Sequence, residues 1–225
     1  MAGEEEIGQS PVAHRAYKRL GTGRSRGELR SDILYAVRET LRDGSYETLT
    51  IEQVAAKTSI SRRTIYNLFQ DKDDIYRQSC ETLIRSVADL VVDEIPERMS
   101  SIDGIRFYIT SCIDVFSNTA AQDLLRSVAR DGAQHPWLVS SYYRHVREPL
   151  IRVCELFLLK KSRRTPLSIG APRYIGVQVM DIVKSMIIAP LVFNYRDPVS
   201  EILPEQMDII AQAYASLIDG KAGRI

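Results

Sequence analysis

The stretch SISRRTIYNLF, residues 59–69, combines side chains that can read the edges of nucleobases. Arg62 and Arg63 carry planar guanidinium groups whose N–H donors match O6 and N7 of guanine, or the oxygens of a phosphate. Asn67 carries an amide that can pair with the edge of an adenine. Such residues, close together along one stretch, point to an interface with double-stranded DNA.

The apolar residues of this stretch are few, and they favour a short helix. Ile65, Leu68 and Phe69 are spaced at i, i+3 and i+4, so they lie along one narrow edge of a helix over residues 62–69. We expect this edge to pack on the protein, because it is where apolar surface can be buried. The other side chains then face outward, where a DNA groove could accept them.

Two more helices precede this one. Gly44 ends a helix expected over residues 27–43, whose apolar residues recur at helical spacing. Thr50 is a suitable N-cap for a short helix over residues 51–58.

The connection between the short helices predicts a helix-turn-helix unit. Residues 59–61 form a tight turn, and Ser61 caps the helix that follows. Two short helices joined by such a turn, braced by a first helix, place the second of them in the major groove of DNA. An ordinary solvated surface of three helices is the alternative interpretation, because this geometry also occurs without DNA.

Hydroxyl and amino groups around the turn are suited to holding the DNA backbone. Thr50 and Ser61 cap helices whose free N–H groups can also bind phosphate. Thr64 can bind a phosphate or contact a thymine methyl group, the Tyr66 hydroxyl can reach a phosphate, and Lys72 can bind the strand beyond.

The segment between Arg30 and Tyr76 closely resembles the DNA-binding domain of TetR-family transcriptional regulators. The family pattern combines I-L-x-A, a glycine, T-x-x-x-I-A, G-V-S, T-[LI]-Y-x-x-F and x-K-x-x-L. This chain supplies the corresponding residues in the same order: Ile33, Leu34, Gly44, Thr50, Ile51, Val54, Ala55, Ser61, Thr64, Ile65, Tyr66, Phe69, Lys72 and Ile75. It departs from the pattern at Ser59 and Ile60, where the family usually has Gly-Val, so we expect a non-glycine residue in a left-handed conformation in the turn.

The resemblance implies an all-α protein with an N-terminal three-helix helix-turn-helix DNA-binding domain and a C-terminal helical ligand-binding and dimerisation domain. The implied DNA contacts are Thr50, Tyr66 and Lys72 for phosphate, and Arg62, Arg63, Thr64 and Asn67 for bases. It also implies a homodimer on a palindromic operator, usually a repressor, and an inducer that moves the two DNA-binding domains apart. A transcriptional activator and a ligand-independent regulator remain alternatives, and a helical protein-interaction module is a third.

The rest of the chain is expected to be helical, because no strand-like alternation is visible. A long helix begins near residue 72, with Leu90 and Val91 on its inner face, and Pro96 marks its end. An interruption is expected at Pro149. Further helices are expected at residues 102–117, 120–131, 136–161, 171–190 and 204–219.

The expected organisation has three parts. Residues 1–26 are a basic flexible arm, residues 27–74 the helix-turn-helix domain, and residues 75–225 the ligand-binding and dimerisation domain. Residues 171–190 and 204–219 are apolar on more than one face, so one face would pack on the core and the other on a second copy of the chain. Such a two-fold homodimer suits an operator of two half-sites.

The C-terminal part also offers candidates for an apolar ligand cavity, although aromatic and apolar residues at helical spacing most often belong to a core. The candidates are Tyr108, Ser111, Cys112, Trp137, Tyr142, His145 and Met180. They predict a largely apolar or aromatic small-molecule inducer, with one acidic or hydroxyl group that meets His145 or Tyr142. His145 fits a solvent-facing or core position better than a ligand contact.

The bulk composition argues against several other classes of protein. With 30 basic and 29 acidic residues, net charge favours no partner, so attraction to DNA must come from local patterning. The three cysteines are widely spaced and no metal-ligand or catalytic motif is present, so we expect reduced thiols, no metal, no cofactor and no enzyme activity. Apolar runs are too short to span a membrane and no signal peptide is visible, which favours a cytoplasmic protein.

Overall fold

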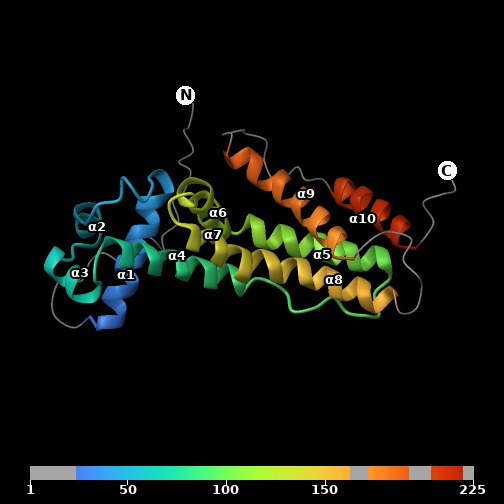
Figure 1. The fold of residues 1–225 in the computed structure, drawn as a ribbon, viewed down its shortest axis with the longest axis horizontal. Helices are drawn as coiled ribbons and strands as arrows, with labels where there is room; N and C mark the ends of the chain where they lie inside the picture. Colours follow the sequence, from blue (N-terminus) through green and yellow to red (C-terminus); the bar gives the residue numbers. More distant parts are fainter. Residues whose placement is uncertain (1–23, 163–171, 193–203, 220–225) are drawn as a thin grey trace, which may run out of the picture.

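The computed structural model describes residues 24–162, 172–192 and 204–219, and the regular elements in these ranges are helices. Helices α1 (Arg26–Asp43), α2 (Ile51–Thr58) and α3 (Arg62–Leu68) gather at one end of an elongated molecule (Figure 1). We call these three helices the reading head. Most of the expected basic arm, residues 1–26, lies outside the described residues.

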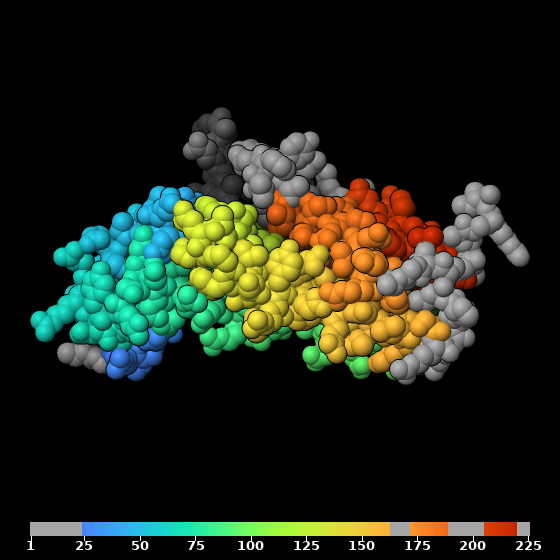
Figure 2. Space-filling model, viewed as in Figure 1, coloured from blue at the N-terminus to red at the C-terminus, as the bar shows by residue number. Residues whose placement is uncertain are grey.

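Helix α4 (Lys72–Ala88) leads from the reading head into a helical bundle. The bundle contains α5 (Ser101–Ser117), α6 (Thr119–Asp131), α7 (Pro136–Tyr142), the π-helical turn η1 (Tyr143–Arg147), α8 (Glu148–Ser162), α9 (Pro172–Val192) and α10 (Pro204–Ile218). Helix α8 packs along α9, and α5 packs on α9 and α10. In Figure 2 the reading head forms one end of the surface, and α8, α9 and α10 lie toward the other.

One apolar core runs through both parts of the molecule. Ile75, Tyr76 and Cys80 of α4 are fully buried, and α4 packs against both α1 and α6. The proposed boundary between residues 74 and 75 therefore falls inside a helix that the reading head and the bundle share. Within the described ranges, no helix has the length and apolar character needed to cross a bilayer.

The expected length of α4 was wrong at its C-terminal end. The helix ends at Ala88, well before Pro96, and Leu90 is 37% exposed where an inward position was expected. The N–H groups of Leu90 and Val91 bond to the carbonyls three residues earlier, at 3.1 Å each, which is a tightened turn. Asp89 lies at the C-terminal end of the helix, and Asp93 and Glu94 follow it. Negative charge is unfavourable at the negative end of the helix dipole, which favours the early end of α4.

The interruption expected at Pro149 takes the form of a π-helical turn. Helices α7 and α8 follow one another through η1, which ends two residues before the proline. Proline has no N–H to donate, so the regular backbone hydrogen bonding cannot continue through it.

Candidate nucleic-acid interface

Side-chain hydrogen bonds cap the N-termini of both short helices, α2 and α3. Thr50 Oγ1 accepts from the Gln53 N–H at 3.2 Å, and Gln53 Oε1 accepts from the Thr50 N–H at 2.9 Å. Ser61 Oγ accepts from the Thr64 N–H at 3.1 Å and lies 2.8 Å from Thr64 Oγ1. Ser59 has φ 55° and ψ 27°, which confirms the left-handed residue expected in the turn.

Helix α3 is attached to the protein along one apolar edge. Ile65 and Phe69 are 0% and 3% exposed, and Leu68 is partly buried. Tyr66 is 52% exposed. The other exposed side chains of the helix are Arg62, Arg63 and Asn67. The predicted inner edge and polar outer face are therefore both present.

Arg62 has a protein partner that the sequence did not reveal. Its Nη1 donates to Glu52 Oε1 on α2 at 2.5 Å, and both side chains are 63% exposed. This hydrogen bond lowers the pKa of Glu52. The pair joins two helices, so neither helical spacing nor a motif could have indicated it. Arg62 must leave or share this carboxylate to contact DNA.

Lys72 lies where the loop after α1 meets the start of α4. Its amino group is 4.3 Å from the centre of the Tyr46 ring and donates to the Glu47 carbonyl at 3.4 Å. The Tyr46 hydroxyl donates to Asp73, and this hydrogen bond, with some burial, raises the pKa of Tyr46 to about 12. Tyr46 thus positions Lys72 beside α3, although the sequence analysis gave Tyr46 no role.

The same loop is tied to the end of α6. Asp131 is 3% exposed, and its carboxylate accepts from the Tyr76 hydroxyl at 2.8 Å and the Tyr46 N–H at 3.3 Å. Trp137 of α7 packs beside this junction between the loop after α1, α4 and the end of α6, and the centre of its ring lies 6.2 Å from that of the Tyr76 ring. The Arg77 guanidinium lies 4.4 Å from the Trp137 ring centre. Trp137, a candidate for ligand contact, therefore lies between the reading head and the bundle.

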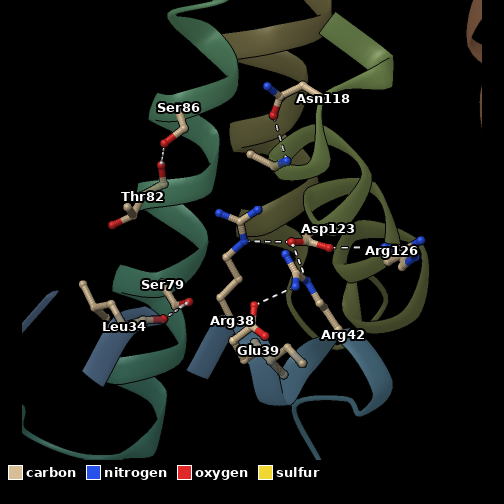
Figure 3. Close-up of polar contacts among 12 residues, drawn as sticks. Leu34, Arg38, Glu39, Arg42, Ser79, Thr82, Ser86, Asn118, Asp123 and Arg126 are labelled. Carbon is tan, nitrogen blue, oxygen red and sulfur yellow. Dashed lines mark hydrogen bonds and ion pairs between the residues drawn. The ribbon is translucent and has the colours of Figure 1, made fainter. Parts of the chain in front are cut away.

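A second buried acid joins α6 to α1. Asp123 is 5% exposed, and Figure 3 shows it reaching from α6 toward two arginines of α1. Asp123 Oδ2 accepts from Arg38 Nε at 2.7 Å and from Arg42 Nε at 3.2 Å. Asp123 Oδ1 accepts from Arg126 Nη1 at 3.2 Å. The reading head is therefore held against the bundle by charged contacts as well as by apolar packing.

A family match covers the elements of this interface. Residues 33–78 match the profile of the family described as "Bacterial regulatory proteins, tetR family". The matched range begins in α1, includes α2 and α3, and ends in α4. The match takes in 46 of the 225 residues of the chain and includes the helix-turn-helix unit, so this part of the chain is similar to the DNA-binding segment of tetR-family regulators.

Solved structures share the fold of this chain over most of its length. The Flavonoid-responsive Regulator FrrA gives a TM-score of 0.63 at 16% identity, covering 84% of this chain and 96% of that one. A TetR-family regulator from Pseudomonas syringae pv. tomato gives 0.62 at 16% identity, covering 85% and 95%. FadR from Bacillus subtilis, solved with stearoyl-CoA, gives 0.54 at 10% identity, covering 85% and 98%. No curated protein matches the sequence.

Four of the ligand candidates lie inside the helical bundle: Tyr108, Ser111, Cys112 and Met180. The Tyr108 hydroxyl donates to the Gly176 carbonyl of α9 at 3.0 Å, and Ser111 Oγ donates to the Phe107 carbonyl at 2.8 Å. Burial raises the pKa of Cys112 to about 12, as expected for an inert core thiol. The hydroxyls of Tyr108 and Ser111 thus already have protein partners.

Tyr142 and His145 are placed differently. The Tyr142 hydroxyl is buried and makes no hydrogen bond with the described residues, and burial raises the pKa of Tyr142 to about 12. His145 is exposed and lines a groove of about 340 Å³ between the segment after α4 and α8, together with Val92 and Arg152. The seven candidates are therefore distributed among the bundle interior, this groove and the junction at Trp137.

Proposed function

We propose that this chain is a TetR-family transcriptional regulator, a dimeric repressor that inserts α3 into the major groove of a palindromic operator and is released by a small-molecule inducer. The observation that carries the proposal is the outer face of α3. Arg62, Arg63 and Asn67 are exposed on a helix whose apolar edge is buried against the protein. A helix held this way after a tight turn can enter the groove without unfolding any part of the core.

The contacts fall into two sets. Thr50, Ser61, Tyr66 and Lys72 are proposed to bind phosphates. They lie at the N-cap of α2, at the N-cap of α3, on the exposed face of α3 and at the start of α4. Arg62, Arg63, Thr64 and Asn67 are proposed to read bases. Thr64 is hydrogen-bonded to Ser61, and Arg62 to Glu52. On binding, Thr64 and Arg62 would therefore each exchange a protein partner for DNA.

Dimerisation is proposed through α9 and α10. Ile175 and Val179 of α9 are buried against the bundle, while Tyr174 is 67% exposed and Ile182 37% exposed on the same helix. Ile209 of α10 is 66% exposed. Large apolar side chains exposed on two neighbouring terminal helices are typical of a surface that a second copy covers.

The inducer is proposed to be largely apolar or aromatic and to carry a group that bonds to the Tyr142 hydroxyl. A buried hydroxyl without a protein partner is rare, and a ligand atom would satisfy it. Of the proteins with this fold, FrrA is named as responsive to a flavonoid and FadR was solved with stearoyl-CoA; the flavonoid is aromatic and stearoyl-CoA has a long apolar chain, which supports an inducer with a large apolar or aromatic part.

Selection of DNA from a random pool by the purified protein, at physiological salt, tests the proposed function. We expect an enriched palindrome of two half-sites, because a two-fold dimer presents two copies of α3. The double variant Arg62→Ala/Arg63→Ala is the control, and it should lose the enriched bases. Binding that is salt-sensitive but selects no sequence would contradict the proposal.

A further inference from the structure

The C-terminal end of α3 is not stabilised by α3 itself. The last turn of the helix contains no basic residue, and the Phe69 N–H closes it by bonding to the Ile65 carbonyl at 2.9 Å. The carbonyls of Asn67 and Leu68 come after that last bond and need donors from elsewhere. A helix of seven residues is also too short to be stable alone, so its orientation depends on what surrounds it.

Helix α1 supplies these donors. Arg30 Nη1 donates to the Leu68 carbonyl at 2.7 Å, and Arg26 Nη2 donates to the Asn67 carbonyl at 3.4 Å. Two positive charges from α1 therefore lie at the negative end of the α3 dipole. Arg30 makes the shorter bond and is partly buried, whereas Arg26 is exposed.

Arg30 also contacts two further parts of the same corner. Its guanidinium carbon lies 4.5 Å from the centre of the Phe69 ring, and its Nη2 donates to Gln78 Oε1 on α4. Gln78 Nε2 donates in turn to Asp74 Oδ1 at 2.6 Å, and Asp74 Oδ2 accepts from the Gln70 N–H at 3.0 Å. One arginine thus connects α1, the end of α3 and the first turns of α4.

We propose that Arg30 is a positioning residue for DNA readout: it sets the orientation of α3 on the reading head, and thereby the register of Arg63 and Asn67 against the bases, without contacting DNA. The apolar edge of α3 is narrow, so burial of Ile65 and Phe69 alone leaves the helix free to roll about that edge. A planar fork that binds a carbonyl, an amide and a ring face together prevents this rotation. Lysine cannot replace it, because an ammonium group has neither the fork nor the flat face.

The variant Arg30→Lys tests the inference, because it keeps the charge at the end of α3 and removes the fork. This test rests on the proposed function, so wild-type protein must first yield an operator. We expect affinity for that operator to fall about tenfold, because the base contacts lose alignment. Affinity for random DNA, the salt dependence of binding and the helical circular dichroism signal should stay as in the wild type. Arg85→Lys, at an exposed arginine of α4 away from α3, is the matched control.

A second variant tests the inference in case Arg30→Lys fails to fold. Gln78→Ala removes the partner of Arg30 on α4 and leaves Arg30 in place, so a smaller loss of operator affinity with the same unchanged binding to random DNA is expected. If Arg30→Lys does not fold, this variant decides the question.

Other outcomes would overturn the inference. An equal loss on operator and random DNA, with the salt slope reduced by about one, would make Arg30 a phosphate contact. Unchanged operator affinity in both variants would show that the apolar edge alone orients α3. If the wild type selects no operator, the proposed function itself has failed, which is a separate result.

Discussion

At the residue scale, three of the side chains expected to meet DNA already have protein partners. Arg62 is paired with Glu52, Thr64 with Ser61, and Lys72 lies against the loop after α1. DNA binding at these positions exchanges one hydrogen bond for another, so its net gain is smaller than a count of new contacts suggests. These partners lower the entropic cost of binding, because side chains that are already held in place lose less conformational freedom on contact with DNA.

Glu52→Gln should strengthen binding to all DNA sequences by about two- to fivefold, since it removes a surface ion pair and a negative charge near the phosphates. Titration of operator and random DNA at constant salt would measure the effect. Glu81→Gln, at an exposed acid of α4, controls for the change in net charge. A weaker, less selective complex would instead show that Glu52 aims Arg62 at its base.

At the element scale, α6 determines how the reading head sits on the bundle. Its two buried acids, Asp123 and Asp131, are eight residues apart and so lie on a similar face of the helix. Asp123 binds arginines of α1, and Asp131 binds Tyr46 and Tyr76. A shift of α6 must therefore move the reading head with it or break these contacts.

Asp123→Asn should lower the free energy of unfolding by about 1–3 kcal/mol, because three arginines lose their shared buried carboxylate. The arginine side chains are 25–35% exposed, so water replaces part of the loss. Denaturant unfolding would measure it, with Asp208→Asn as the control at an ion pair that is 48% exposed on the acid side. Equal stability of the two variants would mean that apolar packing alone holds α1 to α6.

The ion pair between Glu148 and Arg173 should make stability depend on pH on the acid side. Arg173 donates to both oxygens of Glu148, at 2.7 and 2.6 Å, and this lowers the pKa of Glu148 below 4.5. The folded state thus favours the charged carboxylate more than the unfolded chain does. The stabilisation is present above pH 4.5 and is lost as pH falls through the lowered pKa.

Glu148→Gln should therefore be less stable than the wild type at neutral pH, by less than about 1 kcal/mol because the pair is half exposed. The difference should shrink as pH falls below 4.5 and vanish below the lowered pKa of Glu148, where the carboxyl of the folded protein is protonated as well. Thermal melts across this range would show it, with Asp114→Asn as the control for loss of an exposed acid. A difference independent of pH would assign the effect to packing.

At the scale of the whole molecule, the two proposed binding surfaces lie toward opposite ends. The reading head occupies one end, and α9 and α10 lie toward the other (Figure 1). Contact between two copies through α9 and α10 would leave both reading heads free for DNA. The shape of the chain is thus compatible with a dimer on two half-sites.

Ile209→Glu should turn the dimer into a monomer, because it places a charge where apolar surface would be buried between copies. Light scattering after size exclusion would give the mass, and operator affinity should fall sharply since the half-sites are no longer bound together. Leu90→Glu, at an exposed leucine after α4, should remain dimeric. A dimeric Ile209→Glu protein would remove α10 from the proposed interface.

The sequence predicted the local features well and the distant contacts poorly. The caps Thr50 and Ser61 and the left-handed Ser59 act within a few residues, so spacing revealed them. The pair of Arg38 and Asp123 joins positions 85 residues apart, which no periodicity in one sequence can indicate. The ligand candidates lie in different parts of the protein. Apolar spacing identifies buried residues, but it does not indicate which of them line the same cavity.

Helix α4 begins beside α3 and ends at the groove that His145 lines. The helix has 17 residues, so at a rise of 1.5 Å per residue it is about 25 Å long and can transmit a tilt from one end to the other. A tilt of about 5° about its distal end would carry Lys72 sideways by about 2 Å, more than a hydrogen bond to phosphate tolerates. In the proposed dimer, two-fold symmetry would double that swing and change the spacing between the two copies of α3 by several ångströms, so a disturbance too small to alter the core would decide whether both half-sites are held.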